Sequence, residues 1–426
     1  MGGPEYKAKS ASMNSLFKKK TNYNYYILLS IIFGGFLIFG LSENIKGPAI
    51  PKIQTEFGLT EAQIGFLLAL NSLGYLLACS FTSALAMKIG IKWTGVISFA
   101  FMALSGVTIY FSKFYFALSA SYFLLYIANG MLEIGLGIMA ARIFTKNTGM
   151  MMNLAHFFYG LSSIAAPVFA SSMMTWNVAE GEIGWRGMYL VVLSFSLLPI
   201  IPSLVGKFPE EKAGKEEATS YQALIRDPIA WLIVAILSFG VISEMSVGNW
   251  LVNFLVKAYN WNLQDAAEML SLFFIFFTLS RLFLGPVTDK VGYTLSVMIF
   301  SLFSGICSLS AVLIGEKGAI LFAVAGIGIA PIYPTVMAIL AKLYPKGTGA
   351  AITFTVTLMG IASVIGNFLI GFIIDSIGKS FPSFGSGENN IIGLQAGYGF
   401  IAILALVCSV CCILLFIVLR KRNKVV

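Results

Sequence analysis

The sequence has few charged residues and a single histidine. Charged residues make up 11% of its 426 residues and hydrophobic residues 58%, whereas a soluble domain usually has about 25% charged residues. A soluble chain of this length could not bury so much apolar surface, but a bilayer supplies an apolar phase around the protein. The composition therefore excludes an ordinary soluble fold and indicates a membrane protein.

Several kinds of site are missing from the sequence. The five cysteines fall inside apolar runs without metal-ligand spacing, so neither disulfides nor a metal site is expected. No phosphate-binding loop, nucleotide-binding fold or catalytic triad is visible. We therefore expect no enzyme activity, no metal, no cofactor and no nucleic-acid partner. Basic loops facing an anionic lipid surface account for the net charge of +9.

Twelve long apolar runs follow one another along the chain. They are apolar on all sides, unlike the short alternating strands of a membrane barrel, and the first is too long for a signal peptide. The sequence predicts an all-α membrane protein with twelve transmembrane helices in two pseudo-symmetric six-helix bundles. The predicted spans are residues 25–50, 62–87, 94–111, 116–139, 151–174, 188–205, 229–256, 269–287, 294–313, 319–343, 349–374 and 396–419.

Polar segments suggest how the chain is divided. The longest, residues 207–227, separates the two sets of spans as a solvated linker. The predicted parts are a tail (1–24, in which 1–12 are interpreted as a possible tag remnant), a bundle (25–206), the linker, a second bundle (228–419) and a basic tail (420–426). Most Lys and Arg residues fall on the side of both termini. This bias predicts cytoplasmic termini in the plasma or inner membrane.

An internal repeat supports the division into halves. Three sets of residues in the first half recur in the second half at an offset of about 200 residues. Such a repeat is expected for duplicated halves that rock around a central site. They are Glu43 and Gly47 with Glu244 and Gly248, Gly90 with Gly292, and Gly160 with Gly360.

The loop after the eighth span contains Gly285, Asp289, Lys290 and Gly292. It resembles the Gly-x-x-x-Asp-Arg/Lys-x-Gly loop of the major facilitator superfamily, and the resemblance covers nearly the whole chain. The resemblance implies that Asp289 latches the two halves in one conformation. The equivalent loop after the second span has Met87 in place of the Asp. The alternative is a plain tight turn, with Gly292 ending the helix and Lys290 as a membrane anchor.

Within the superfamily, several spans are similar to the fucose–galactose–glucose:proton symporter family. The similar segments are Glu133 in span four, residues 153–167 in span five, Glu244 and Trp250 in span seven, Arg281 in span eight and residues 326–334 in span ten. The sequence departs from the family pattern in two places. Gly137 and Ile138 stand where the family has Asn-Pro, and Gly47 stands where its span-one Asp aligns. The resemblance implies proton-coupled transport of a monosaccharide or small glycoside by a monomer in contact with membrane lipids.

Four charged residues lie well inside the predicted spans: Glu43, Glu133, Glu244 and Arg281. Each costs about 2.5–3.5 kcal/mol or more at a helix centre, so each is expected to have a function or a partner. A low dielectric favours a protonated carboxylic acid, and a nearby guanidinium favours the ionised form. The group can therefore bind and release a proton, and the resemblance implies that Glu133 carries it while Arg281 tunes it. The alternatives are a static Glu133–Arg281 pair and a hydrated Glu43 near the outer mouth.

His156 is the remaining candidate for proton coupling. An imidazole titrates near neutral pH, but a buried one also serves as a neutral hydrogen-bond partner or packing group. Sugar recognition requires amide and hydroxyl groups and an aromatic face. The substrate candidates are Asn129, Asn153, Tyr159, Asn249, Trp250, Asn253, Tyr333 and Asn367. Polar groups of this kind also link helices in membranes.

Two other functions remain open. Ala166 and Pro167 after Gly160 resemble a motif of drug:proton antiporters, so the alternative to a sugar symporter is a proton-coupled exporter of drugs or metabolites. A membrane scaffold without transport activity is the second alternative, and the intramembrane charges argue against it. The sequence leaves the substrate, the direction of transport, and the choice between proton and sodium undecided.

Overall fold

The computed structural model describes residues 4–144, 148–178, 181–208, 221–345, 347–381 and 391–422, without the side chains of residues 4–22, 148–150 and 153. Nearly all of these residues are helical. The first half contains α1 (Pro4–Asn44), α2 (Lys46–Phe57), α3 (Glu61–Ile89), α4 (Ile91–Tyr110), α5 (Tyr115–Ile143), α6 (Thr148–Met174), β1 (Asn177–Val178), β2 (Gly181–Glu182), α7 (Gly184–Ser194), η1 (Phe195–Leu197) and α8 (Ile200–Val205). The second contains α9 (Tyr221–Arg226), α10 (Pro228–Tyr259), α11 (Leu263–Val291), α12 (Tyr293–Ile314), η2 (Glu316–Gly318), α13 (Ile320–Ile329), α14 (Ile332–Leu343), α15 (Thr348–Ser380) and α16 (Ile391–Lys421).

These helices form 12 stretches that are long and apolar enough to cross a membrane, counted over the described residues. They coincide with the twelve predicted spans, so this prediction is confirmed. The first span differs from the prediction because it is two helices, α1 and α2, with Ile45 between them. Span ten is also broken, between α13 and α14, and span six is interrupted by η1 between α7 and α8. The short β1–β2 hairpin was not predicted.

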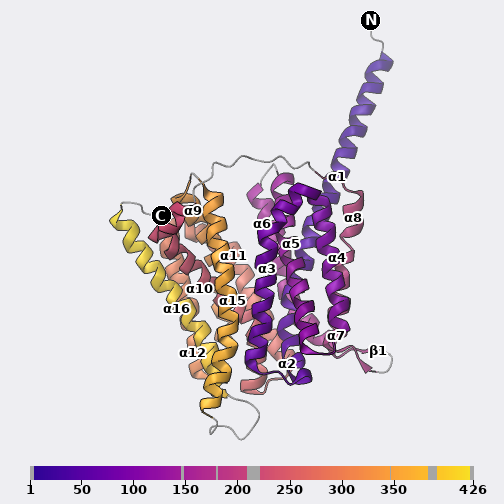
Figure 1. The fold of residues 1–426 in the computed structure, drawn as a ribbon. Helices are drawn as coiled ribbons and strands as arrows, with labels where there is room; N and C mark the ends of the chain where they lie inside the picture. The colour runs from indigo at the N-terminus through magenta and orange to yellow at the C-terminus, as the bar shows by residue number, and fades with distance from the viewer. Residues whose placement is uncertain are drawn as a thin grey trace.

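The helices pack as two bundles of six spans, one formed by α1–α8 and the other by α10–α16 (Figure 1). The start of α1 and the end of α16 lie on one side of the molecule, which we call the termini end. The bundles meet mainly along α3 with α15, α6 with α11, and α2 with α10. The predicted residue boundaries of the tails, bundles and linker stay predictions, and residues 209–220 of the linker lie outside the description.

The repeated residues occupy equivalent places in the two bundles. Gly90 and Gly292 end α3 and α11 with nearly the same backbone angles, φ 85° and 96°, a region that favours glycine. A Cβ atom on Gly160 would lie 2.8 Å from Thr278 on α11, and one on Gly360 would lie 2.7 Å from Leu76 on α3. The same kind of contact thus joins α6 to α11 and α15 to α3, as expected for two related halves.

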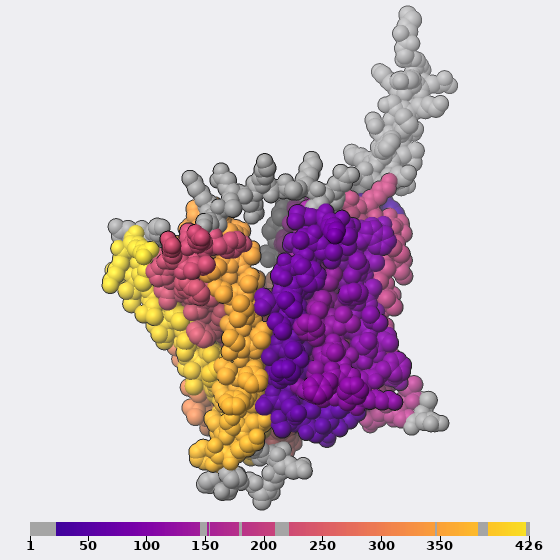
Figure 2. Space-filling model, in the orientation of Figure 1, coloured from indigo at the N-terminus to yellow at the C-terminus, as the bar shows by residue number. Residues whose placement is uncertain are grey.

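The two bundles are in close contact at the end opposite the termini. A Cβ atom on Gly47 would lie 2.9 Å from the carbonyl oxygen of Gly248, so the two equivalent glycines bring α2 and α10 together. The side-chain hydrogen bonds between the bundles found among the described residues lie from mid-molecule to this opposite end. At the termini end, Figure 2 shows a notch between α3 and α15. The cleft between the bundles therefore opens toward the termini end.

Candidate functional site

The break in the first span positions a buried ion pair. Asn44 ends α1 and donates from Nδ2 to the carbonyl of Gly40 and to Ser163 Oγ on α6, each at 2.9 Å. Directly after the break, Lys46 pairs with Glu43 and donates to the hydroxyl of Tyr126 on α5. The side chains of Lys46 and Glu43 are only 6% and 13% exposed. The structure thus contradicts the hydrated Glu43 considered from the sequence.

Further polar groups from α5 complete the surroundings of Glu43. Asn129 Nδ2 and the Tyr126 hydroxyl each donate to its carboxylate at 3.3 Å. Ser42 Oγ donates to Asn129 Oδ1 at 2.9 Å. Asn129, predicted as a substrate ligand, is fully buried and bonds inside this network in this conformation.

Glu133 has a different partner from the one predicted. Its carboxylate accepts a hydrogen bond from the hydroxyl of Tyr75 on α3. The charges of Glu43 and Arg281 lie within electrostatic reach, but no cation with a described side chain is close enough to form an ion pair with Glu133. A static Glu133–Arg281 pair is therefore not present in this structure.

Arg281 instead forms its contacts inside the C-terminal bundle. Its Nη2 lies 3.5 Å from Oε1 of Glu244, with the two side chains 31% and 24% exposed. Its guanidinium also lies over the ring of Phe277, 4.3 Å from the centroid. The pair joins α11 to α10.

The prolines of span ten explain a further bond of Arg281. Pro331 and Pro334 have no N–H, so the carbonyls four residues earlier, at Ile327 and Ala330, lose their helical partners. Ser280 Oγ donates to the Ile327 carbonyl at 2.7 Å, and Arg281 Nε donates to the Ala330 carbonyl at 3.1 Å. Neighbouring side chains commonly satisfy the backbone groups freed by proline in membrane helices. Arg281 therefore stabilises the helix break as well as pairing with Glu244.

Three of the predicted site residues have aromatic rings: His156, Tyr159 and Tyr333. His156 on α6 is exposed, and its ring centroid lies 5.0 Å from that of Phe36. Tyr159 is half-buried with its ring 5.1 Å from Phe39, and Tyr333 is half-buried at the start of α14. The side chain of Asn153 lies outside the described residues.

The other predicted substrate residues lie in the closed contact between the bundles. Asn249 Nδ2 donates to Asn367 Oδ1, and Asn367 Nδ2 donates to Ser72 Oγ, both at 3.1 Å. Asn253 Nδ2 donates to Glu61 at 3.1 Å, and Trp250 is 2% exposed. Three polar atoms of this group have no partner among the described residues: Asn249 Oδ1, Trp250 Nε1 and Asn253 Oδ1.

The predicted latch loop lies at the termini end. Asp289 and Lys290 are exposed, and Asp289 accepts a hydrogen bond at 2.9 Å from Tyr293 of its own bundle. Gly292 ends α11 as the plain-turn alternative requires, and the Gly285 carbonyl accepts from Thr288. The latch role of Asp289 stays a prediction, because the described bond of its carboxylate lies within its own bundle.

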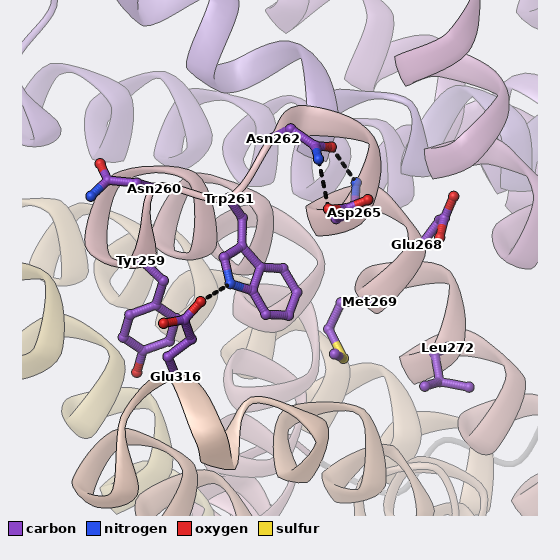
Figure 3. Close-up of a pocket in the computed structure, with 9 residues that line it drawn as sticks. All are labelled: Tyr259, Asn260, Trp261, Asn262, Asp265, Glu268, Met269, Leu272 and Glu316. Atoms are coloured by element: carbon purple, nitrogen blue, oxygen red, sulfur yellow. Dashed lines mark hydrogen bonds between the residues drawn. The ribbon is translucent and has the colours of Figure 1, made fainter.

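A hollow of about 610 Å³ lies at the opposite end of the C-terminal bundle, where α10 connects to α11 (Figure 3). Trp261 Nε1 donates to Glu316 at 2.8 Å, and Asn262 bonds to the side chain and backbone of Asp265. These bonds fix the connection, and none of the predicted site residues lines the hollow. The described residues contain no group of three or more possible metal ligands.

Comparison with known proteins identifies the class. Residues 32–317 and 242–426 match the Major Facilitator Superfamily. The chain belongs to this superfamily, whose members are membrane transporters, so it is a multi-pass membrane transporter and not an enzyme. This confirms the superfamily resemblance.

Individual relatives are distant. Over 402 residues the chain is 21% identical to bypass of stop codon protein 6 of Saccharomyces cerevisiae, covering 81% of this chain and 76% of the yeast protein. Among solved structures, a bacterial homologue of the human lysosomal transporter Spinster, inward-facing and unoccupied, gives a TM-score of 0.78 at 15% identity, covering 94% and 98% of the two chains. A D-xylose–proton symporter gives 0.71 at 14% identity, covering 90% and 97%. The E. coli fucose:proton symporter FucP gives 0.61 at 16% identity, covering 91% and 98%.

The sequence analysis missed Lys46, Tyr75, Tyr126 and Ser280. Lys46 was not counted among the charges inside the predicted spans, although its spacing of three residues from Glu43 is that of a helical ion pair. Tyr75 bonds to Glu133 and Tyr126 to Glu43, in each case on a different helix. These pairings depend on how α1, α3 and α5 are rotated about their axes.

The Lys46–Glu43 pair makes a stability prediction. Removing one partner of a buried pair leaves an uncompensated charge, which costs about 3–5 kcal/mol. We expect Lys46→Met to lower the melting temperature of the purified protein and Glu43→Gln/Lys46→Met to restore most of it. Lys52→Met removes the same charge from an exposed position of α2 and is the control. Equal melting temperatures for Lys46→Met and Lys52→Met would contradict a buried pair.

Proposed function

We propose that this chain is a proton-coupled symporter of a monosaccharide or small glycoside that works by alternating access. The observation that carries the proposal is the way in which the charged side chains inside the spans are paired. Glu43 is paired with Lys46, and Glu244 with Arg281, whereas the only partner of Glu133 among the described residues is a hydroxyl group. A carboxylate without a counter-ion in a low-dielectric site is most easily neutralised by a proton.

The proton is therefore assigned to Glu133. Its side chain is half-buried, so water from the open cleft can reach it while the opposite end is closed. Tyr75 donates to the ionised carboxylate and would hold it in place after the proton leaves.

The sugar is assigned to the amides of α10 and α15. In this conformation Asn249, Asn253 and Asn367 bond to groups of the other bundle or to each other, and unused acceptors remain on Asn249 and Asn253. When the bundles separate at the opposite end, Asn253 loses Glu61 and Asn367 loses Ser72, so these amides can bind sugar hydroxyls instead. Trp250 on the same helix offers an aromatic surface and an unpaired N–H. The xylose and fucose symporters among the similar structures support this substrate class.

The proton assignment predicts a separation of two activities. Glu133→Gln keeps the shape of the side chain but cannot ionise. We expect it to abolish accumulation driven by a pH gradient in proteoliposomes and to keep exchange of labelled sugar for unlabelled sugar. Glu268→Gln, on the exposed end of α11, is the matched control and should keep both activities. Full gradient-driven accumulation by Glu133→Gln would remove Glu133 from the mechanism.

The orientation is a further proposal, with both termini in the cytoplasm of a cell whose plasma or inner membrane holds the monomeric protein. The Lys and Arg bias of the loops supports it. The cleft would then open inward, in agreement with the inward-facing Spinster homologue among the similar structures. A reporter that is active only in the cytoplasm, fused after Val426, should be active. Activity of a periplasmic reporter at the same position would overturn this orientation.

The transport function itself is tested by the sign of the proton movement. A symporter carries sugar and protons together, so adding a transported sugar outside energised cells should make a weakly buffered medium more alkaline. The rival function is a proton-coupled exporter of drugs or metabolites, favoured by Pro167 inside α6. An exporter would instead lower the cellular content of an amphipathic dye in a gradient-dependent way. Dye extrusion, with no alkalinisation from any sugar in a broad panel, would replace our proposal with the rival.

A further inference from the structure

The first turn of α3 is bound by a carboxylate from the other bundle. Asp375 on α15 accepts hydrogen bonds from the backbone N–H groups of Glu61, at 3.1 Å to Oδ1, and Ala62, at 2.9 Å to Oδ2. The first N–H groups of a helix have no partner within the helix, and a negative charge is favourable there. Thr60 already caps this helix by accepting from Gln63 N at 3.2 Å. Asp375 thus supplies a second cap, and this one crosses between the bundles.

The side chain of Glu61 also binds the C-terminal bundle. Its carboxylate accepts from Lys257 Nζ at 2.6 Å and from Asn253 Nδ2 at 3.1 Å, both on α10. The Glu61 side chain is 10% exposed and that of Lys257 is 25% exposed. One residue of α3 is therefore held by α15 through its backbone and by α10 through its side chain.

Glycine makes this approach possible. A Cβ atom on Gly371 would lie 2.3 Å from the Glu61 carbonyl oxygen, and one on Gly65 would lie 3.1 Å from the Cα of Gly371. Asp375 follows Gly371 by one helical turn, so it lies beside the start of α3. We call Asp375, Glu61, Lys257 and Asn253 the charged clamp.

The equivalent corner of the molecule, between α6 and α11, is built differently. There the start of α11 is capped within its own bundle, since Asn262 Oδ1 accepts from Asp265 N at 2.9 Å. The side-chain bond across the bundles is a neutral one, from Ser171 Oγ to Gln264 Oε1 at 2.7 Å. Among the described residues the charged clamp therefore occurs at only one of two pseudo-symmetric corners.

We propose that the charged clamp sets the balance between the two conformations of the transporter, with Asp375 as its central residue. The clamp exists only while the bundles touch at the opposite end, so it favours the conformation with the cleft open to the termini end. Opening the opposite end strips the α3 N-terminus of a cap and separates Glu61 from Lys257. The α6–α11 corner, with one neutral bond, opens at smaller cost.

The test measures the distance between the bundles at the opposite end, with the full-length protein in lipid nanodiscs and no substrate. Spin labels are attached to Lys113→Cys and Lys317→Cys, two exposed positions on different bundles, after the five native cysteines are replaced. We expect Asp375→Asn to raise the ratio of long to short distances about five- to tenfold, the size of effect expected when a charged helix cap is lost. Lys257→Met should shift the ratio in the same direction, and Asp375→Glu should retain most of the short population.

The matched control is Asp265→Asn, an exposed carboxylate at the start of the equivalent helix that bonds only within its own bundle. It should leave the distances unchanged. Unchanged distances in both Asp375→Asn and Lys257→Met would overturn the proposal, and so would an equal shift in Asp265→Asn. The distance measurement uses neither sugar nor a proton gradient, so its result does not depend on the proposed substrate. If the distances shift as expected but separate assays show no sugar transport, the clamp is supported and the proposed substrate is wrong.

Discussion

The structure depends on one constraint, the cost of leaving a charge or a backbone polar group without a partner inside a bilayer. Two of the helix breaks show how it is met. In span ten, Ser280 and Arg281 bind the two carbonyls that Pro331 and Pro334 leave free. In span one, the break at Ile45 is followed at once by Lys46, whose charge is bound by Glu43. These two irregularities in the helices are therefore tied to polar groups of the candidate site.

The same constraint limits what can join the two bundles. A strong contact between them would lock a transporter in one state. The absence of any polar contact would leave polar groups unpaired in the closed conformation. The bundles meet through close glycine contacts such as Gly47 with Gly248, through the neutral amide of Asn367 on Ser72, and through one charged clamp at the edge. Neutral amides are suited to this position because water or substrate hydroxyls can replace their partners when the bundles separate.

Much of this could be predicted from the sequence. Hydropathy predicted the twelve spans because each is a continuous apolar run, and the repeated glycines predicted equivalent halves because the backbone or packing at most of them admits no side chain. The partners of the charges could not be predicted. Whether Arg281 meets Glu133 or Glu244 depends on how α5, α10 and α11 are rotated about their axes. In the sequence, each of the three residues is simply a charged residue inside an apolar span. The clamp was also missed, since Asp375 lies at the end of a span, where a carboxylate needs no partner.

The arrangement of partners constrains how a proton could drive the transporter. Glu43 is paired within the N-terminal bundle, Glu244 within the C-terminal bundle, and Glu133 bonds to Tyr75 of its own bundle. If the bundles move as rigid bodies, all three partnerships travel with them unbroken. A mechanism in which Glu133 gains and loses an arginine partner at each turn would need Arg281 to leave both Glu244 and the Ala330 carbonyl. Coupling more readily follows from water access to Glu133 and from the exchange of amide partners between the bundles, because these are the contacts that the motion changes.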